Sequence, residues 1–385
     1  MRIGFDAKRA FQNSTGLGHY SRTLISSLAL YFPENDYYLF APKITNRYNN
    51  RDYPNLKTIS PLRFPYKILR SAWRSSGVKK DLINNNIDLY HGLSHEIPAG
   101  IKQTGIPSVV TMHDLIFERY PHQYKKIDVW IYRKKFKYAC QNADAIIAIS
   151  RQTKQDLVNI YKVPEEKITV CYQSCDPIFA KKINTEEKEK IRKLYNLPDR
   201  FFLNVGSIIE RKNLLTICKA INHLKNRLPI PLVVIGGGGK YKEQVKQYIN
   251  SNGLQDQIIF LSENRETKQN EGFKSSAHFP AIYQMAEALI YPSTFEGFGI
   301  PILEALFSRV PVITSNVSCM PEAAGDAAAY IDPYDFEFLA LKMEAIANDK
   351  ILAKTMTEKG WDHAQKFTAQ KCAEQVNNVY KKLIK

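Results

Sequence analysis

The sequence predicts an α/β protein made of two domains, each built on its own parallel β-sheet. Short apolar runs of strand length alternate with segments of helical periodicity along the whole chain, an order typical of parallel sheets covered by helices. These runs are too many for one compact sheet. The chain has 385 residues, which is more than one ordinary hydrophobic core holds.

The candidate strands fall into two equal sets. The first half of the chain has apolar runs at 2–5, 37–40, 87–90, 108–112, 145–148 and 168–170. The second half has them at 201–205, 232–235, 258–261, 288–291, 312–314 and 329–331. Helical patterns lie between them, for example at 21–31, 213–227, 240–251 and 336–348. The boundary is expected near 172–185, where Asp176-Pro177 leads into a charged helical segment.

Composition is that of a globular protein without membrane spans. Hydrophobic residues make up 44% and charged residues 24% of the chain, and no apolar run approaches the length of a spanning helix. The N-terminus turns polar too early for a signal peptide. The six cysteines are scattered and do not form a zinc-binding pattern. We therefore expect reduced thiols, no metal site and a cytoplasmic location.

The net charge of +16 predicts anionic partners. Two segments, 63–74 and 124–138, combine aromatic residues with cations. In 124–138 the apolar residues recur at helical spacing beside lysines, which is typical of contact with an anionic membrane surface, such as the inner face of the cell membrane. An ordinary surface helix with inward aromatics fits this segment equally well. For 63–74 the ordinary inward packing is the favoured interpretation.

The run from Tyr291 to Leu306 carries two glutamates, Glu296 and Glu304. An apolar strand leads into a glycine turn, and Pro301 suits the first position of a helix, where an amide hydrogen is not needed. The pattern places Glu296 in the turn and Glu304 in the first helical turn. Free amides at a helix start attract phosphate, and carboxylates accept hydrogen bonds from sugar hydroxyls. The alternative is a solvated Glu296 and a Glu304 that only complements the helix dipole.

A second strand-to-helix junction lies at 201–213. The strand ends at Gly206, and Arg211 and Lys212 stand just before a helix that Asn213 is expected to cap. Two cations at a helix start favour an anion site, although most such pairs are simply solvated. Ligands of open parallel sheets bind at the carboxyl ends of strands, which is where this loop lies.

The first half contains weaker candidates. Gly16 and Gly18 lie in a glycine-rich loop that opens a helix but lacks the full dinucleotide fingerprint. His113 follows an apolar strand, where a ligand contact and a structural role are equally expected. The loop after the strand at 87–90 carries His91 and His95, which are candidates for contacting an acceptor.

Together these segments resemble glycosyltransferase family 4, the retaining group 1 enzymes, over nearly the whole chain. Glu296 and Glu304 lie in a Pro-Ser-x-x-Glu-Gly-Phe-Gly-x-Pro-x-x-Glu-Ala pattern, which is highly specific. Residues 205–213 resemble the family's diphosphate loop, 16–22 resemble its N-terminal glycine loop, and His113-Asp114 matches its strand-end histidine. The segment 263–278 is longer and more polar than is common where the family contacts the base, so the base stays open.

The resemblance implies the GT-B fold, in which two Rossmann-like domains have parallel sheets that face across a cleft. Residues 1–175 would form the acceptor-binding domain and 176–369 the nucleotide-sugar-binding domain. The final helix, 370–385, follows the strands of the second domain and could pack on either domain, with the N-terminal domain as the candidate partner.

The resemblance also assigns roles to residues. Glu304 would bind ribose hydroxyls, and Glu296 would bind donor-sugar hydroxyls near the reacting carbon. Arg211 and Lys212 would hold the diphosphate and stabilise its growing charge, while His113 would touch the donor sugar or the acceptor. Further donor-binding residues would be Phe298, Gly299, Gly206, Gly16 and Gly18. The acceptor candidates are His91, His95 and Tyr20.

The function implied is a retaining hexosyltransferase that forms an α-glycosidic bond on a glycan or lipid-linked acceptor. The donor would be a nucleoside-diphosphate sugar, with GDP-mannose preferred over a UDP-sugar, and no cofactor is expected. The chain has no Asp-x-Asp, so Arg211 and Lys212 are expected to replace a metal. The alternatives are another GT-B enzyme, either an epimerase or a phosphorylase, and a basic nucleic-acid-binding protein. No pyridoxal phosphate signature supports a phosphorylase, and no reader motif supports nucleic acid as a partner.

Overall fold

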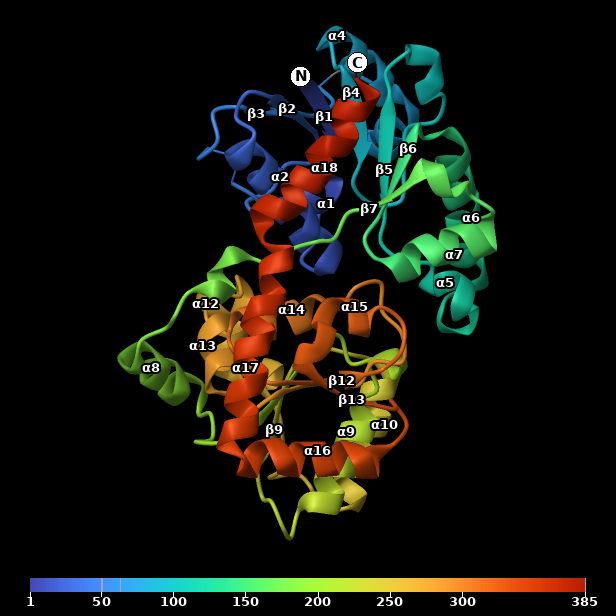
Figure 1. Ribbon diagram of the computed structural model, residues 1–385. Coiled ribbons are helices and arrows are strands. Elements are labelled where there is room, and N and C mark those ends of the chain that lie inside the picture. Colours follow the sequence, from blue (N-terminus) through green and yellow to red (C-terminus); the bar gives the residue numbers. More distant parts are fainter. Residues whose placement is uncertain (50, 63, 385) are drawn as a thin grey trace. The chain divides into compact units, whose positions relative to one another are not determined.

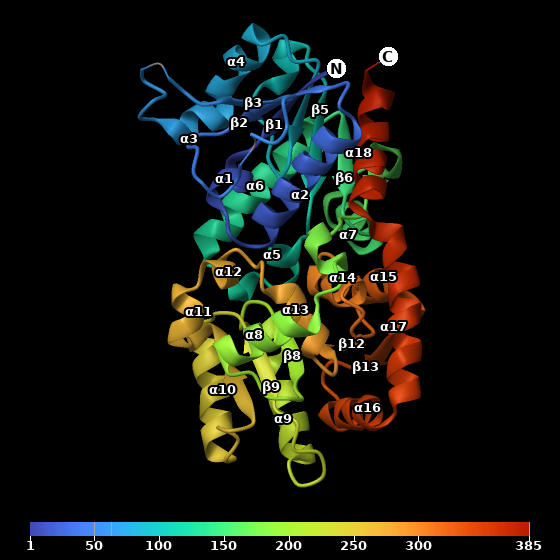
Figure 2. The same cartoon turned by 90° about the vertical axis from the view of Figure 1, so that its left-hand side faces the viewer.

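A computed structural model describes residues 1–49, 51–62 and 64–384. The chain divides into two compact units, Met1–Cys175 with Phe367–Lys385, and Asp176–Lys366. Figures 1 and 2 show the first unit in blue to green with its final helix in red, and the second in green to orange-red. Arg63, the first residue of the segment 63–74, and Lys385, the last residue of the segment 370–385, lie outside the described residues.

The first unit is built on a seven-stranded parallel sheet of order β3-β2-β1-β4-β5-β6-β7. Its strands are β1 (Arg2–Asp6), β2 (Asp36–Phe40), β3 (Leu56–Ile59), β4 (Leu89–Gly92), β5 (Ser108–Met112), β6 (Ala145–Ala148) and β7 (Ile168–Val170). Its α-helices are α1 (Lys8–Gln12), α2 (Gly16–Tyr31), α3 (Arg70–Ala72), α4 (Val78–Asn84), α5 (Ile116–Arg119), α6 (Lys126–Asn142), α7 (Arg151–Tyr161) and α18 (Ala369–Leu383). A π-helical turn, η1 (Trp73–Gly77), joins α3 to α4.

The second unit repeats this plan with six parallel strands in the order β10-β9-β8-β11-β12-β13. Its strands are β8 (Phe202–Val205), β9 (Leu232–Ile235), β10 (Ile258–Phe260), β11 (Leu289–Tyr291), β12 (Val312–Ser315) and β13 (Ala328–Ile331). Its longer helices are α8 (Thr185–Tyr195), α9 (Leu214–Leu224), α10 (Lys240–Ser251), α14 (Ile300–Phe307), α16 (Phe336–Asn348) and α17 (Lys350–Ala364). The shorter helices are α11 (Arg265–Gln269), α12 (Glu271–Lys274), α13 (Phe279–Met285) and α15 (Met320–Ala324).

The predicted α/β class with two parallel sheets is confirmed. Each predicted strand appears within two residues of its expected bounds, because each is an apolar run and most of them are buried in a sheet. The strand β3 was not predicted. It pairs with one neighbour only, and its alternation of apolar and polar residues over four positions is a weak signal.

The last helix, α18, packs on α2 within the first unit, and both views show them side by side (Figures 1 and 2). Val376, Val379 and Tyr380 of α18 share a buried cluster with Leu24 and Leu28 of α2. The hydroxyl of Tyr380 also lies 2.6 Å from His91 Nδ1 at the sheet. The chain therefore returns to the first unit after forming the second.

Both sheets have a topological switch point, where connections leave in opposite directions. In the first unit it lies between β1 and β4, and in the second between β8 and β11. Loops that leave the carboxyl ends of two such strands diverge and open a crevice, which is where open α/β sheets bind ligands. The fold therefore predicts one ligand-binding position in each unit, at its switch point.

Candidate active site in the second unit

The switch point of the second unit brings the two predicted strand-to-helix junctions together. After β8 the chain passes Gly206 and forms a short 3-10 turn at Glu210–Lys212 before α9. After β11 it crosses a loop that contains Glu296 and enters α14. Because β8 and β11 are neighbours in the sheet, the side chains of both loops meet at one edge.

Glu296 is the centre of a buried ionic cluster. Its carboxylate lies 2.9 Å from Arg211 Nη1 and 3.0 Å from Lys212 Nζ. The hydroxyls of Tyr291 and Ser293 each donate to the same carboxylate at 2.9 Å. Glu296 is 7% exposed and Arg211 is 8% exposed. The predicted proximity of the three charged residues is therefore present in this structure.

The cluster keeps Glu296 ionised. Burial by itself would raise the pKa of this carboxyl group, but the charges and hydrogen bonds of Lys212 and Arg211 outweigh burial and lower the pKa to about 2. With two cations against one carboxylate, the cluster has a net positive charge. It therefore presents cationic groups to an anion while holding a carboxylate among them.

The backbone of Glu296 is fixed by the loop after β12. Ser318 Oγ donates to the carbonyl oxygen of Glu296 at 2.8 Å and accepts from its amide at 3.3 Å. The thiol of Cys319 also lies 3.0 Å from that carbonyl oxygen. The carboxylate is thus positioned from both its side chain and its main chain.

Two glycines make room for this arrangement. Gly206 has a φ of +140°, and a Cβ on it would lie 3.1 Å from Lys212 Cδ. Gly299 has a φ of +96° and caps the start of α14, where Pro301 is the second helical residue. Phe298, between the turn and the helix, is buried. The predicted turn is confirmed, whereas Pro301 lies one position further into the helix than predicted.

Glu304 differs from the prediction in position. It is the fifth residue of α14, so it lies in the second helical turn and not in the first. Tyr283 donates a hydrogen bond of 2.6 Å to its carboxyl group. Burial raises the pKa of Glu304, and the Tyr283 hydrogen bond and the charge of Lys212 offset only part of this effect. The resulting pKa is about 7. Glu304 is therefore a titrating group near the ionised cluster.

Asn213 also differs from the prediction. It precedes α9 with a left-handed φ of +59°, and its side chain does not accept an amide hydrogen bond of the helix. Its side-chain amide instead donates to the carbonyl oxygen of Pro292 at 3.2 Å, and its Oδ1 accepts from the Thr216 hydroxyl at 2.8 Å. Asn213 thus ties the β8 loop to the β11 loop, and the predicted capping hydrogen bond is wrong.

In the first unit, His113 and His95 form one cluster after β5 and β4. His113 Nε2 lies 2.9 Å from the carbonyl oxygen of Leu93, and the amide of His113 donates to His95 Nε2 at 2.9 Å. Tyr20 packs edge-on against the His113 ring at 4.5 Å between centroids. Burial lowers the pKa of both histidines to about 3. Both imidazoles are therefore neutral, and His113 is only 5% exposed.

His91 is placed as a structural residue. It is 0% exposed, and its ring nitrogens lie 2.6 Å from the Tyr380 hydroxyl and 2.8 Å from Thr111 Oγ1. The acceptor contact predicted for His91 conflicts with this geometry, because both nitrogens are engaged inside the core. Tyr20 bonds the same Thr111 at 3.1 Å and is likewise buried.

The two glycines of the N-terminal loop differ in their surroundings. A Cβ on Gly18 would lie 2.0 Å from the carbonyl oxygen of Asn13, so this glycine permits a close approach within its own loop. A Cβ on Gly16, at the first position of α2, would meet no atom within 4 Å. Only Gly16 therefore leaves open space at the start of the helix.

Comparison with known proteins decides the family. The model for glycosyl transferases group 1 matches residues 185–363, and the model for glycosyltransferase family 4 matches residues 21–177. The chain belongs to the family 4 group 1 glycosyltransferases. It is 25% identical to the O-antigen chain mannosyltransferase B of Escherichia coli over all of both chains. It is 30% identical to the O-antigen chain mannosyltransferase RfbU of Salmonella typhimurium, over 63% of this chain and 60% of that protein.

A solved structure shares the fold. Alr3699/HepE of Anabaena, in complex with UDP and glucose, superposes with a TM-score of 0.72 and 15% identity, covering 99% of each chain. The GT-B fold expected from the sequence is thereby confirmed for this glycosyltransferase.

Several residues of the glycosyltransferase site were not predicted. They are Tyr291, Ser293, Tyr283 and Ser318, which hydrogen-bond the two glutamates, and the glycine run Gly236 to Gly239, which follows β9. A Cβ on Gly236 would lie 1.8 Å from the carbonyl oxygen of Gly206. Four consecutive glycines between a strand and a helix are a signal that the sequence did carry. Tyr291 and Ser293 lie in the run 291–306 that carries the motif, but the motif does not show that their hydroxyls turn toward Glu296. Tyr283 and Ser318 gave no signal, because they lie 21 and 22 residues from the glutamates that they contact.

Proposed function

We propose that this glycosyltransferase transfers a mannosyl residue from a nucleoside-diphosphate sugar, GDP-mannose, to a glycan acceptor and retains an α configuration. The observation that carries the donor assignment is the Glu296–Arg211–Lys212 cluster at the switch point between β8 and β11. The choice of mannose is supported by the two O-antigen mannosyltransferases to which the chain is similar.

The cluster suits departure of a diphosphate. As the glycosidic bond breaks, negative charge grows on the phosphate and positive character grows on the sugar carbon. Arg211 and Lys212 are fixed cations that stabilise the leaving charge without reorganising. Glu296, ionised beside them, accepts hydrogen bonds from donor-sugar hydroxyls and balances the developing charge on the ring.

We infer that the two cations do the work of a divalent metal in this reaction. Arg211 is held by the loop of Glu296 and Lys212 by Tyr291, whose hydroxyl lies 2.5 Å from the lysine Nζ. The side chains therefore arrive at the phosphate already oriented. Transfer measured after removal of divalent ions with EDTA should continue at the rate seen with Mg²⁺ or Mn²⁺. A strict requirement for either ion would refute this part.

Glu304 is proposed to bind the ribose hydroxyls in its ionised form. His113 is proposed to contact the sugar or the incoming acceptor hydroxyl as a neutral imidazole, because burial holds its pKa near 3. In this role it orients a hydroxyl group and does not carry a positive charge.

A donor panel tests the proposed function. Slow hydrolysis of GDP-mannose, UDP-glucose and other nucleotide sugars is measured without an acceptor, together with the rise in melting temperature caused by GDP and by UDP. Preferential hydrolysis of GDP-mannose and stabilisation by GDP are expected. Hydrolysis of a UDP-sugar alone would overturn the donor assignment, and the absence of any nucleotide effect would overturn the donor site itself.

We also propose that the enzyme binds an anionic membrane surface through the segment 62–70. Leu62 and Phe64 are each 82% exposed, and Ile68 is 73% exposed. No acidic residue lies between Asp52 and Asp81, a stretch with seven lysines and arginines. Exposed apolar side chains beside cations are the combination that interfacial membrane contact requires.

Of the two segments considered for membrane contact, the one at 63–74 is now the stronger candidate and the one at 124–138 the weaker. The expected inward packing of 63–74 holds for Trp73 but is wrong for Phe64. In α6, Phe136 is buried, whereas Ile127 and Trp130 are exposed, so this helix contributes a smaller apolar area. Within the part of the chain that the structure describes, no helix is both long and apolar enough to cross a membrane.

A further inference from the structure

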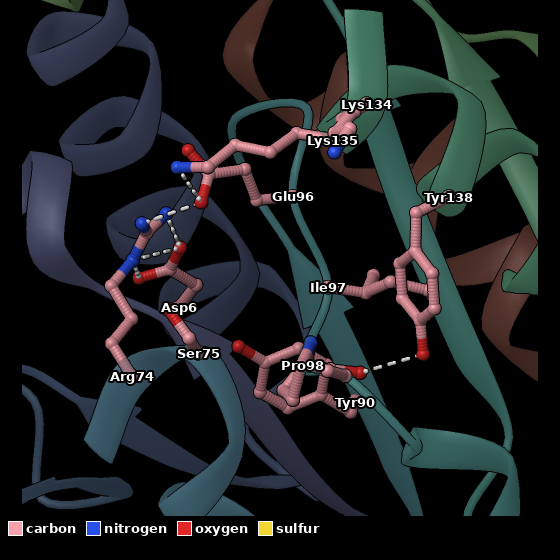
Figure 3. A pocket seen from close by; sticks show the side chains of 11 residues that line it. Asp6, Arg74, Ser75, Tyr90, Glu96, Ile97, Pro98, Lys134, Lys135 and Tyr138 are labelled. Carbon is pink, nitrogen blue, oxygen red and sulfur yellow. Dashed lines mark hydrogen bonds and ion pairs between the residues drawn. The ribbon is translucent and has the colours of Figure 1, made fainter. Parts of the chain in front are cut away.

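The first unit has a pocket at its own switch point, within the domain that the resemblance assigns to the acceptor, and none of its lining residues is among the predicted acceptor contacts. It has a volume of about 310 Å³. Asp6 ends β1, and Tyr90 and Glu96 belong to β4 and its following loop, so the pocket lies at the carboxyl ends of the two strands that flank the switch point. The walls are completed by η1 and α6 (Figure 3).

One side of the pocket is an ionic cluster. Arg74 Nε donates to the two carboxylate oxygens of Asp6 at 2.9 and 3.1 Å, and its Nη1 donates to Glu96 at 2.8 Å. Lys135 of α6 reaches the same Glu96 oxygen at 3.1 Å. Figure 3 shows Asp6, Arg74 and Glu96 gathered on this side, with Tyr138 opposite. The arrangement parallels the second unit, where a carboxylate is also held between two cations.

This cluster costs free energy that packing alone would not require. Asp6 is 2% exposed and the Arg74 side chain is 10% exposed. Burial by itself would raise the pKa of Asp6, but Arg74 outweighs burial and keeps the pKa below its ordinary value, so the carboxylate is ionised. A buried ion pair is weak support for stability, whereas charged groups in a crevice are typical of a binding site.

The remaining walls are apolar and rigid. Ile97, Pro98 and Ala99 form one wall, and the aromatic rings of Tyr90 and Tyr138 contribute others. The Tyr138 hydroxyl accepts from the Gly100 amide at 2.6 Å, and the Ala99 amide donates to the Ser75 carbonyl oxygen at 2.7 Å. These bonds hold the pocket open in advance of a ligand, which reduces the entropic cost of binding.

We propose that this pocket binds a neutral pyranose ring of the glycan acceptor, an assignment that rests on the glycosyl transfer proposed above. The C–H faces of a pyranose fit the aromatic and aliphatic walls, and its hydroxyls donate to the carboxylates of Asp6 and Glu96. The pocket volume is at the small end of ligand sites, which suits a single ring.

A phosphate group fits this pocket less well than a neutral sugar. The carboxylates of Asp6 and Glu96 would repel it, and the Arg74 guanidinium already donates hydrogen bonds to both of them. Lys134 at the rim lies 3.7 Å from the centroid of the Trp130 ring, outside the ionic cluster. A purely aliphatic ligand would place apolar surface against the charged side of the pocket and offer no hydrogen bonds to it, which costs free energy.

Ligand-observed saturation-transfer NMR tests the proposal. The probes are the methyl α-pyranosides of mannose, glucose, galactose and N-acetylglucosamine, with inorganic phosphate as a competitor. Ala99→Trp and Ser75→Trp fill the pocket from two positions without removing an ionic partner, and Ala99→Ser is the matched control. A signal from at least one pyranoside is expected in the wild type and in Ala99→Ser, with a loss of about tenfold or more in affinity in both tryptophan variants.

Three outcomes would overturn the proposal: no pyranoside signal in the wild type, equal signals in wild type and tryptophan variants, or displacement of the sugar by phosphate. GDP binding to the second unit is measured in the same samples. Loss of GDP binding in every sample points to failure of the donor assignment. Normal GDP binding without pyranoside binding points to failure of the pocket assignment alone.

Discussion

At the scale of single residues, the two glutamates of the motif have opposite electrostatic surroundings. Glu296 faces two cations and has a pKa of about 2, whereas Glu304 faces a tyrosine hydroxyl in a buried setting and has a pKa of about 7. Environments that separate two carboxyl groups in this way usually give them different roles. We expect Glu296 to act as a permanent charge and Glu304 to be a group whose protonation controls donor binding.

Removal of the Lys212 charge should slow the reaction more than it weakens binding. For Lys212→Ala we expect a fall in turnover of about two powers of ten, near 3 kcal/mol, because one fixed donor to the leaving phosphate is lost. Steady-state transfer kinetics measure it. Lys225→Ala, which changes an exposed lysine after α9, is the control and should leave the rate unchanged. Wild-type turnover in Lys212→Ala would remove the diphosphate assignment.

The raised pKa of Glu304 predicts a pH dependence of donor binding. If only the ionised carboxylate binds ribose, the Kd for GDP should be about tenfold lower at pH 8 than at pH 6. Calorimetric titration across this range measures it, and Glu304→Gln should show a weak and nearly flat profile. A steep profile that persists in Glu304→Gln would assign the titration to another group.

The same group also affects stability, with the opposite sign. The pKa of Glu304 is about 7 in the folded protein against an ordinary value of 4.5, so the folded state holds the proton more tightly. Its contribution to the free energy of unfolding is complete below pH 4.5 and is lost as pH rises through 7. Urea unfolding at pH 5 and pH 8 should therefore show a larger loss of stability with pH in the wild type than in Glu304→Gln. Equal slopes would contradict the burial of this carboxyl group.

The sequence was informative about these residues only where a local pattern constrained them. The turn at Gly299 and the place of Pro301 in the first helical turn follow from backbone preferences that are visible over a few positions. The second-turn place of Glu304 depends on where α14 begins, and helix ends are poorly defined by sequence. The ties from Ser318 and Tyr283 join segments 22 and 21 residues away, so a linear pattern does not show them.

At the scale of elements, periodicity predicted most strands and helices because the buried runs are continuous. The exceptions are places where the apolar pattern of the sequence is weak. The edge strand β3 buries only one of its four residues fully, and α2 begins at Gly16, five residues before its apolar pattern is obvious. The sequence left open which domain the last helix packs on, because the helix's own sequence does not name its partner, and the structure places α18 in the first unit.

The contact between α18 and β4 gives a prediction about this packing. Tyr380→Phe leaves His91 Nδ1 without its partner in a fully buried site, and we expect a loss of about 1–3 kcal/mol in the free energy of unfolding. Faster amide hydrogen exchange in α18 should accompany it. Tyr334→Phe changes a tyrosine that is 74% exposed and is the control. Unchanged stability and exchange in Tyr380→Phe would show that apolar packing alone holds α18.

At the scale of the whole molecule, one topology is used twice. Each unit has a parallel sheet with a switch point, and at each switch point a carboxylate is clamped by cations: Glu296 in the second unit, and Asp6 with Glu96 in the first. The alternation of strands and helices predicted the sheets, but the order of the strands, and therefore the switch point, is a property of tertiary structure. For this reason the sequence did not predict the ion pair of Arg74 with Asp6, which lies 68 residues away along the chain.

Membrane association is the prediction that depends on the distribution of charge and apolar surface over the molecule. Vesicles of phosphatidylglycerol and phosphatidylcholine should bind the wild type at low salt, and pure phosphatidylcholine should not, because the cations of the first unit are screened only weakly at low ionic strength. In Phe64→Ser/Ile68→Ser the partition coefficient should fall at least about tenfold, since each buried side chain contributes roughly 1.5–3 kcal/mol.

The control for this experiment is Ile351→Ser, which removes one isoleucine that is 79% exposed on the second unit. It matches the change in surface hydrophobicity at a single position without touching the segment 62–70, so its vesicle binding should equal that of the wild type. Two results would end the proposal: no sedimentation of the wild type with anionic vesicles at low salt, or an equal loss of binding in the control and the double variant. The second result would mean that general surface hydrophobicity governs binding, and not the cationic segment of the first unit.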